Sequence, residues 1–211
     1  MGDPPLSGRR AQAAVNDQVI LESARAVFTA DPAAPIADVA KHAGVGISAL
    51  YRRYPGKDDL LRTLAAGGLA RFIHETEIAL ADDGDPWDAF AGFMRSAVDA
   101  DTSSLTRALA GTFTPTPEMW ADGQRANDLL SQLFERTRAS GVLRADVEVH
   151  DLSLLFEQLS AIRVRDPGRT RALRHRYLGL LLEALRAPGA GALPGPAPSW
   201  AEINERWAAT Q

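Results

Sequence analysis

Apolar residues recur every three or four positions along most of this chain, which is the period of a helix with one buried face. No segment alternates with the period of a strand. The pattern predicts helices over residues 16–30, 35–44, 47–54, 58–81, 87–103, 105–110, 117–141, 148–165 and 167–187. We therefore expect an all-α fold.

Proline, glycine and aspartate clusters divide this pattern. They predict a flexible N-terminal arm over residues 1–12, a small helical domain over 13–60 and a larger helical bundle over 61–187. Residues 188–211 read as a Pro/Gly linker followed by a short helix, because Ser199 and Glu202 have the spacing of a capping box. Trp200 and Trp207 share one face of that helix, so we expect it to fold back onto the body.

A helix-turn-helix is predicted within the small domain. Ala40 and Ala43 are small enough for a close helix crossing, and Gly44 supplies the left-handed conformation that closes the first helix. Val45 fills the turn, and a helix of under three turns follows. Small residues at the crossing and a glycine at the turn are what two steeply crossed helices require.

The region around this turn is basic, although the whole protein has a formal net charge of −4. Between residues 39 and 57 the chain carries Lys41, Arg52, Arg53 and Lys57 and no Asp or Glu. Four cations on short helices often form only a solvated face. Next to a helix-turn-helix they favour contact with the phosphates of DNA.

The segment from Leu50 through Tyr51, Arg52, Arg53, Tyr54, Pro55 and Gly56 to Lys57, with the preceding helices, resembles the tetracycline-repressor (TetR/AcrR) family over about residues 16–62. The resemblance implies a three-helix DNA-binding domain followed by a helical bundle for ligand binding and dimerisation. It also implies a sequence-specific repressor that a small, largely apolar effector releases from a palindromic operator. Gly46, Ser48 and Ala49 stand where the family usually has Ser, Gly and Thr.

The same resemblance assigns the residues that contact DNA. Tyr51, Arg53 and Lys57 occupy positions where the family places phosphate contacts. Ile47, Ser48, Ala49 and Arg52 lie at the start or on the outer face of the second helix. Arg52 is the candidate base reader, because arginine to guanine is the commonest specific contact in the major groove.

The helices predicted over 148–165 and 167–187 carry more apolar positions than one buried face uses. In the TetR family such a pair packs against its two-fold mate as a four-helix bundle, so the resemblance implies a homodimer. The residues expected at this interface are Leu155, Leu159, Leu178 and Leu181. The alternative is that these leucines fill the core of a single chain.

The larger domain is also rich in bulky side chains. A pocket lined by them would take an apolar or aromatic effector with few polar anchors. The candidate residues are Trp87, Phe90, Phe93, Met94, Phe113, Trp120, Phe134 and Phe156. The alternative is that they simply fill the core.

The sequence argues against most other chemistry. It has no cysteine, and its four histidines lie far apart without the spacing of zinc ligands. We therefore expect no metal, no cofactor and no catalytic site. No segment approaches 18 apolar residues, so we expect a cytoplasmic protein that does not enter a membrane. The open alternative is a helical ligand carrier or small enzyme on a TetR-like scaffold without specific DNA binding, because Gly46, Ser48 and Ala49 offer no long side chain to base edges.

Overall fold

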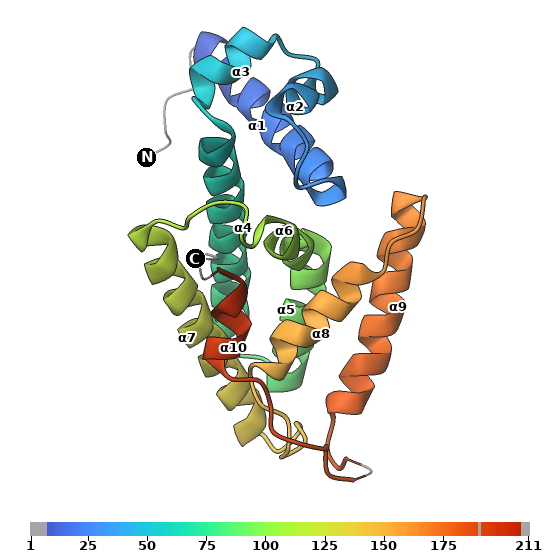
Figure 1. Cartoon of the computed structure of the whole chain (residues 1–211). Coiled ribbons are helices and arrows are strands. Elements are labelled where there is room, and N and C mark those ends of the chain that lie inside the picture. Colours follow the sequence, from blue (N-terminus) through green and yellow to red (C-terminus); the bar gives the residue numbers. More distant parts are fainter. Residues whose placement is uncertain (1–7, 190, 208–211) are drawn as a thin grey trace. The chain divides into compact units, whose positions relative to one another are not determined.

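The computed structural model describes residues 8–189 and 191–207. The chain divides into two compact units, Met1–Ala65 and Ala66–Gln211, and the division falls within one long helix, α4 (Lys57–Ala81). Figure 1 shows the helices in chain order. The described residues form α-helices, a short 3-10 turn and an isolated antiparallel bridge between Leu143 and Arg186. The predicted all-α fold is confirmed.

Unit 1 contains α1 (Gly8–Ala30), α2 (Ile36–Ala43), α3 (Ile47–Arg53) and the first turns of α4. The apolar faces of these helices meet in a small core, with α1 packed against α2 and α2 against α3. Its fully or nearly fully buried side chains include Ala24, Phe28, Val39, Leu50, Leu60 and Leu61. These are the inward positions that the helical period predicts.

Helix α1 begins earlier than the sequence pattern predicts. It starts at Gly8 and not near Asn16, so the residues predicted as an arm are helical from Gly8 onward. Residues 1–7 of that arm lie outside the described part of the chain. The segment from residue 9 to residue 14 consists of Arg, Ala and Gln, whose high helix propensity favours this longer helix.

Unit 2 contains the rest of α4 and the helices α5 (Pro86–Ala100), α6 (Thr102–Leu109), α7 (Pro117–Ala139), α8 (Asp151–Ala161) and α9 (Pro167–Leu185). Helix α5 is central, because it contacts α6, α7, α8 and α9. Nine of its fifteen residues are buried, among them Phe90 and Met94. Its apolar positions are therefore wide enough to pack against several neighbouring helices, while Asp88, Arg95 and Asp99 stay exposed.

Three helices of unit 2 begin in the same way. A side chain at the N-cap accepts a hydrogen bond from a free backbone N–H of the first turn, and proline occupies the first helical position. The pairs are Asp85-Pro86, Thr116-Pro117 and Asp166-Pro167. The predicted start of α7, at residue 117, is therefore confirmed.

Helices α5 and α8 end earlier than the sequence predicts, by three and four residues. Helix α5 ends at Ala100 and not at Ser103, because Asp101 adopts a left-handed conformation with φ 50°. Helix α8 ends at Ala161 and not at Arg165. The Arg174 guanidinium of α9 donates to the carbonyls of Ser160 (2.9 Å) and Ile162 (3.1 Å), so α8's last carbonyls are satisfied by a side chain from another helix.

The C-terminal segment folds back onto unit 2, as the tryptophan spacing predicts. Ser199 and Glu202 form the expected capping box at the start of α10 (Trp200–Asn204), which a 3-10 turn (Glu205–Trp207) follows. The Trp200 ring stacks on His150 with centroids 5.8 Å apart, and Trp207 packs edge-on against Phe113 at 5.9 Å. Each aromatic pair of this kind contributes about 1 kcal/mol beyond its buried area.

None of the helices in the described ranges combines the length and the apolar character needed to cross a bilayer.

Candidate nucleic-acid interface

The turn between α2 and α3 has the geometry that the sequence predicts. Gly44 has φ 67°, its N–H donates to the Lys41 carbonyl (3.3 Å), and the Val45 N–H donates to the Ala40 carbonyl (3.0 Å). This pair of bonds is a Schellman motif, which satisfies two of the last carbonyls of α2. It ends α2 sharply, so that α3 can start at Ile47.

Helix α3 presents an open face to solvent. Only Leu50 is buried, with no exposed surface. Ile47 is 40% exposed and Tyr51 is 47% exposed, and Ser48 and Arg52 are also exposed, while Ala49 is half-buried. This face combines apolar, hydroxyl and guanidinium groups, which are the groups that contact base edges and thymine methyls.

Arg53 at the end of α3 is tied to α1. Its guanidinium binds both carboxylate oxygens of Asp17, with Nε to Oδ1 at 3.0 Å and Nη2 to Oδ2 at 2.7 Å. The hydrogen bond that Arg53 donates to Asp17 raises the pKa of Arg53. Because 61% of the Arg53 side chain stays exposed, one edge of the guanidinium is held while the rest faces solvent. The pair links the end of α3 to α1.

Lys57 is also engaged within unit 1. Its ammonium donates to the carbonyls of Pro32 and Ala34, each at 2.8 Å, and lies 5.1 Å from the centre of the Phe28 ring. An ammonium has three donors, so these bonds leave one for a phosphate. Lys57 therefore connects the start of α4 to the loop between α1 and α2, which is a structural role that its position in the sequence did not indicate.

Of the expected contact residues, the structure thus brings five together on the open face of α3: Ile47, Ser48, Ala49, Tyr51 and Arg52. Asp17, the residue that orients Arg53, was missed by the sequence analysis. It lies 36 positions away, and no local pattern connects the two. Within residues 8–189 and 191–207 no group of three or more His, Asp or Glu side chains is arranged to hold a metal ion.

The aromatic residues expected around an effector lie mostly in the core of unit 2. One buried cluster contains Trp87, Phe90, Phe93, Met94, Phe134 and Phe156. Phe93 contacts Phe72 at 5.4 Å and Phe156 at 6.2 Å, both edge-on. Phe113 instead packs against Trp207, and Trp120 is 44% exposed at the surface of α7.

The leucines expected at a subunit interface fall into two groups. Leu159 and Leu178 are 2% and 1% exposed, so their surfaces are used inside unit 2. Leu155 and Leu181 are half-buried and pack against the edge of the same core. The exposed apolar side chains of α8 and α9 are Leu154 (37%), Tyr177 (48%) and Leu180 (59%), which the sequence analysis did not select.

Taken together, these features define a class of protein: an all-α chain with an N-terminal helix-turn-helix and a separate helical bundle. Family comparison agrees with this class. Residues 20–64 match the family described as bacterial regulatory proteins of the tetR family, and residues 85–187 match the SbtR-like transcriptional regulator C-terminal domain. The chain belongs to the TetR family of transcriptional regulators.

Individual relatives point the same way. The chain is 39% identical over 69 residues to the HTH-type transcriptional repressor LfrR of Mycolicibacterium smegmatis, a match that spans 33% of this chain and 34% of that repressor. A TetR regulator structure from Mycobacterium vanbaalenii is 27% identical, with TM-score 0.55, over 84% of this chain and 99% of that one.

The fold is also shared with the structure of LfrR in complex with proflavine. That likeness has TM-score 0.60 and 23% identity, and it covers 85% of this chain and 99% of the LfrR chain.

Proposed function

We propose that this protein is a homodimeric repressor that binds a palindromic DNA operator through α3 and is released by a small, largely apolar effector. The observation that carries the DNA-binding part is the open face of α3, where Tyr51 and Arg52 lie exposed beside a left-handed turn at Gly44. From Val39 to Lys57 the chain has no carboxylate that would repel phosphate.

Arg52 is the proposed base-reading residue. Duplexes recovered from a random pool with the wild-type protein would define its preferred sequence, and fluorescence anisotropy would measure affinity for that sequence and a scrambled one. Arg52→Ala should reduce the preference by about 1–3 kcal/mol at the position it reads. The matched control is Lys41→Ala, which removes an exposed cation of α2 and should weaken binding to both duplexes alike.

An equal loss on both duplexes for Arg52→Ala would show that Arg52 contacts only phosphate. If the wild type bound all duplexes alike, even with competitor DNA, the operator function would be wrong. The alternative function, a helical ligand-binding protein or small enzyme without specific DNA binding, would then be favoured.

The proposed dimer uses α8 and α9. These helices have an apolar surface with the exposed side chains Leu154, Tyr177 and Leu180. In a two-fold dimer the same surface of both copies would be buried in the interface. Leu155 and Leu181 lie beside them at the edge of the core. Leu159 and Leu178 support the interface from beneath. The two chains of such a dimer would contribute two α3 helices, one for each of two operator half-sites about 34 Å apart.

The proposed effector acts on unit 2. LfrR, a relative of similar fold, was solved with proflavine, a ligand named in the description of that structure. In this chain the buried aromatic cluster around Phe93 and Phe156 supplies an apolar environment for such an effector. The cluster is closely packed, so an effector would have to enter by displacing side chains at its edge.

A further inference from the structure

Asp17 of α1 is a carboxylate that the fold places beside the end of α3. Its side chain is 26% exposed, and its two oxygens accept hydrogen bonds from Nε and Nη2 of Arg53. Between residues 39 and 57 the sequence has no Asp or Glu, so the anion next to this basic segment comes from another helix. A carboxylate close to DNA repels its phosphates. Asp17 would therefore disfavour DNA binding unless it supports the contact that Arg53 makes.

The two carboxylate contacts occupy one edge of the Arg53 guanidinium. They use the Nε hydrogen and one hydrogen of Nη2, so Asp17 does not use the end of the group, which consists of Nη1 and the other Nη2 hydrogen. Two parallel N–H bonds at that end match two oxygens of a phosphate. Because most of the Arg53 side chain is exposed, it can hold Asp17 and a phosphate at the same time.

The surroundings of Arg53 also restrict its side chain. The Arg53 Cζ lies 6.0 Å from the centre of the Tyr54 ring, and Tyr54 is itself buried. The carboxylate of Asp17 and this fixed ring together leave the guanidinium few conformations. A long side chain that is already held loses less conformational entropy when it binds a ligand than one that moves freely. Arg53 is therefore organised for a phosphate contact before DNA binds.

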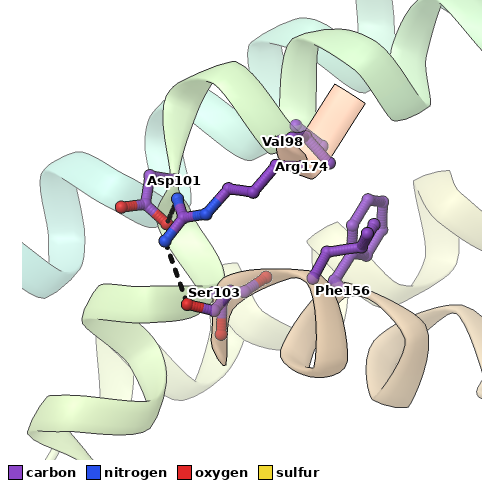
Figure 2. A pocket seen from close by; sticks show the side chains of 8 residues that line it. Val98, Asp101, Ser103, Phe156 and Arg174 are labelled. Carbon is purple, nitrogen blue, oxygen red and sulfur yellow. Dashed lines mark hydrogen bonds and ion pairs between the residues drawn. The ribbon is translucent and has the colours of Figure 1, made fainter. Parts of the chain in front are cut away.

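The Arg174–Asp101 pair of unit 2 is a useful contrast, because that arginine is used inside the fold. Figure 2 shows its guanidinium beside Asp101, with 2.7 Å between Nη1 and the carboxylate. It also donates to the carbonyls of Ser160 and Ile162, and its side chain is only 8% exposed. The adjacent cavity, of about 10 Å³, has room for one water molecule. Arg174 therefore has a structural role, whereas Arg53 presents its guanidinium to solvent.

We propose that Asp17 is a positioning residue for operator binding, which holds Arg53 so that the end of its guanidinium contacts a phosphate of the operator. This contact fixes the register of α3 on the duplex. Through that register the pair contributes to sequence preference, although neither residue reads a base. The pair is neutral as a whole, so it adds little to the long-range attraction of DNA. The inference rests on the repressor function proposed above and adds a residue of α1 to its DNA contact.

The test uses a difference in sign. Asp17→Asn removes a negative charge and places an amide NH2 group against a donor of Arg53. If Asp17 acted only through its charge, the substitution would tighten binding to every duplex. If Asp17 positions Arg53, binding to the duplex selected with the wild-type protein should weaken about tenfold. The loss on the scrambled duplex should be smaller, because nonspecific binding needs no fixed register. Fluorescence anisotropy at one fixed salt concentration measures both affinities.

Three further variants separate positioning from charge and from folding. Glu22→Gln is the matched control, because it removes the same charge from an exposed position of α1 that accepts a hydrogen bond from Gln18. It should leave the preference between the two duplexes unchanged. Asp17→Glu keeps two carboxylate oxygens and should retain most of the preference. In an Arg53→Gln background, Asp17→Asn should have no further effect on the preference, because the side chain through which it acts is gone. Circular dichroism establishes that each variant is folded.

Tighter binding of the Asp17→Asn protein to both duplexes would overturn the proposal, because Asp17 would then act only as a repelling charge. A loss of preference that persisted in the Arg53→Gln background would also overturn it, since Asp17 would then act by another route. A wild type without preference for any duplex would reject the repressor function itself, before any variant is compared. A wild-type preference that Asp17→Asn left unchanged would reject this inference alone.

Discussion

At the scale of single residues, Asp99 on α5 is a pH-dependent contact to α9. It accepts two hydrogen bonds from Arg171 (2.7 and 2.9 Å) and lies 2.7 Å from His175 Nε2. The Arg171 hydrogen bonds lower the pKa of Asp99 from 3.8 to about 2. A carboxylate whose pKa is lower in the folded state than in the unfolded state stabilises the fold above its unfolded pKa. This stabilisation is lost as the pH falls through the pKa of the folded state.

Asp99→Asn should therefore reduce the free energy of unfolding by about 1 kcal/mol near neutral pH. In urea unfolding the difference should disappear between about pH 4 and pH 2, and a difference independent of pH would contradict this assignment.

At the scale of elements, the turn that joins α2 to α3 depends on the left-handed backbone conformation of Gly44. A Cβ added there would meet no atom within 4 Å, so the left-handed φ of 67° is what a larger residue has to accommodate. Gly44→Ala should lower the stability of the protein by about 1 kcal/mol. Gly44→Asn should cost less, because asparagine tolerates this conformation. Thermal unfolding of the two variants compares them directly, and an equal loss for both would mean that crowding and not backbone conformation sets the requirement.

At the scale of the whole molecule, the proposed dimer allows two α3 helices to bind the two half-sites of one operator. Leu180 is the most exposed of the large apolar residues on α8 and α9, at 59%. Leu180→Glu places a charge in the proposed interface, and it should give a monomer at micromolar concentration in sedimentation, with much weaker binding to the selected palindrome. Ile78→Glu is the control, since Ile78 is 53% exposed on α4 and lies outside the proposed surface. A Leu180→Glu protein that remained dimeric would exclude this face as the interface.

The sequence by itself determined the local structure of this protein. Helical period, the proline after each N-cap and the glycine at the turn act through residues no more than about four positions apart. That is why α3, the start of α7 and the capping box at Ser199 lie where the sequence predicts. The family resemblance follows from the same local features, because the residues from Gly44 to Lys57 form a turn and a short helix in one continuous segment.

Only the tertiary structure decided which of several similar side chains are buried in the core and which stay exposed. Leu159 and Leu180 look alike in an apolar helical pattern, yet one is 2% exposed and the other 59%, because burial depends on which helix faces meet. Arg53 is held by Asp17 across 36 positions, and Arg174 meets Ser104 across 70. Such contacts leave no periodic signal in the sequence, since each depends on the packing of helices far apart in the chain. The open face of α3 could therefore be predicted from local sequence, whereas the hydrogen bonds of Lys57 and the buried contacts of Arg174 required the folded chain.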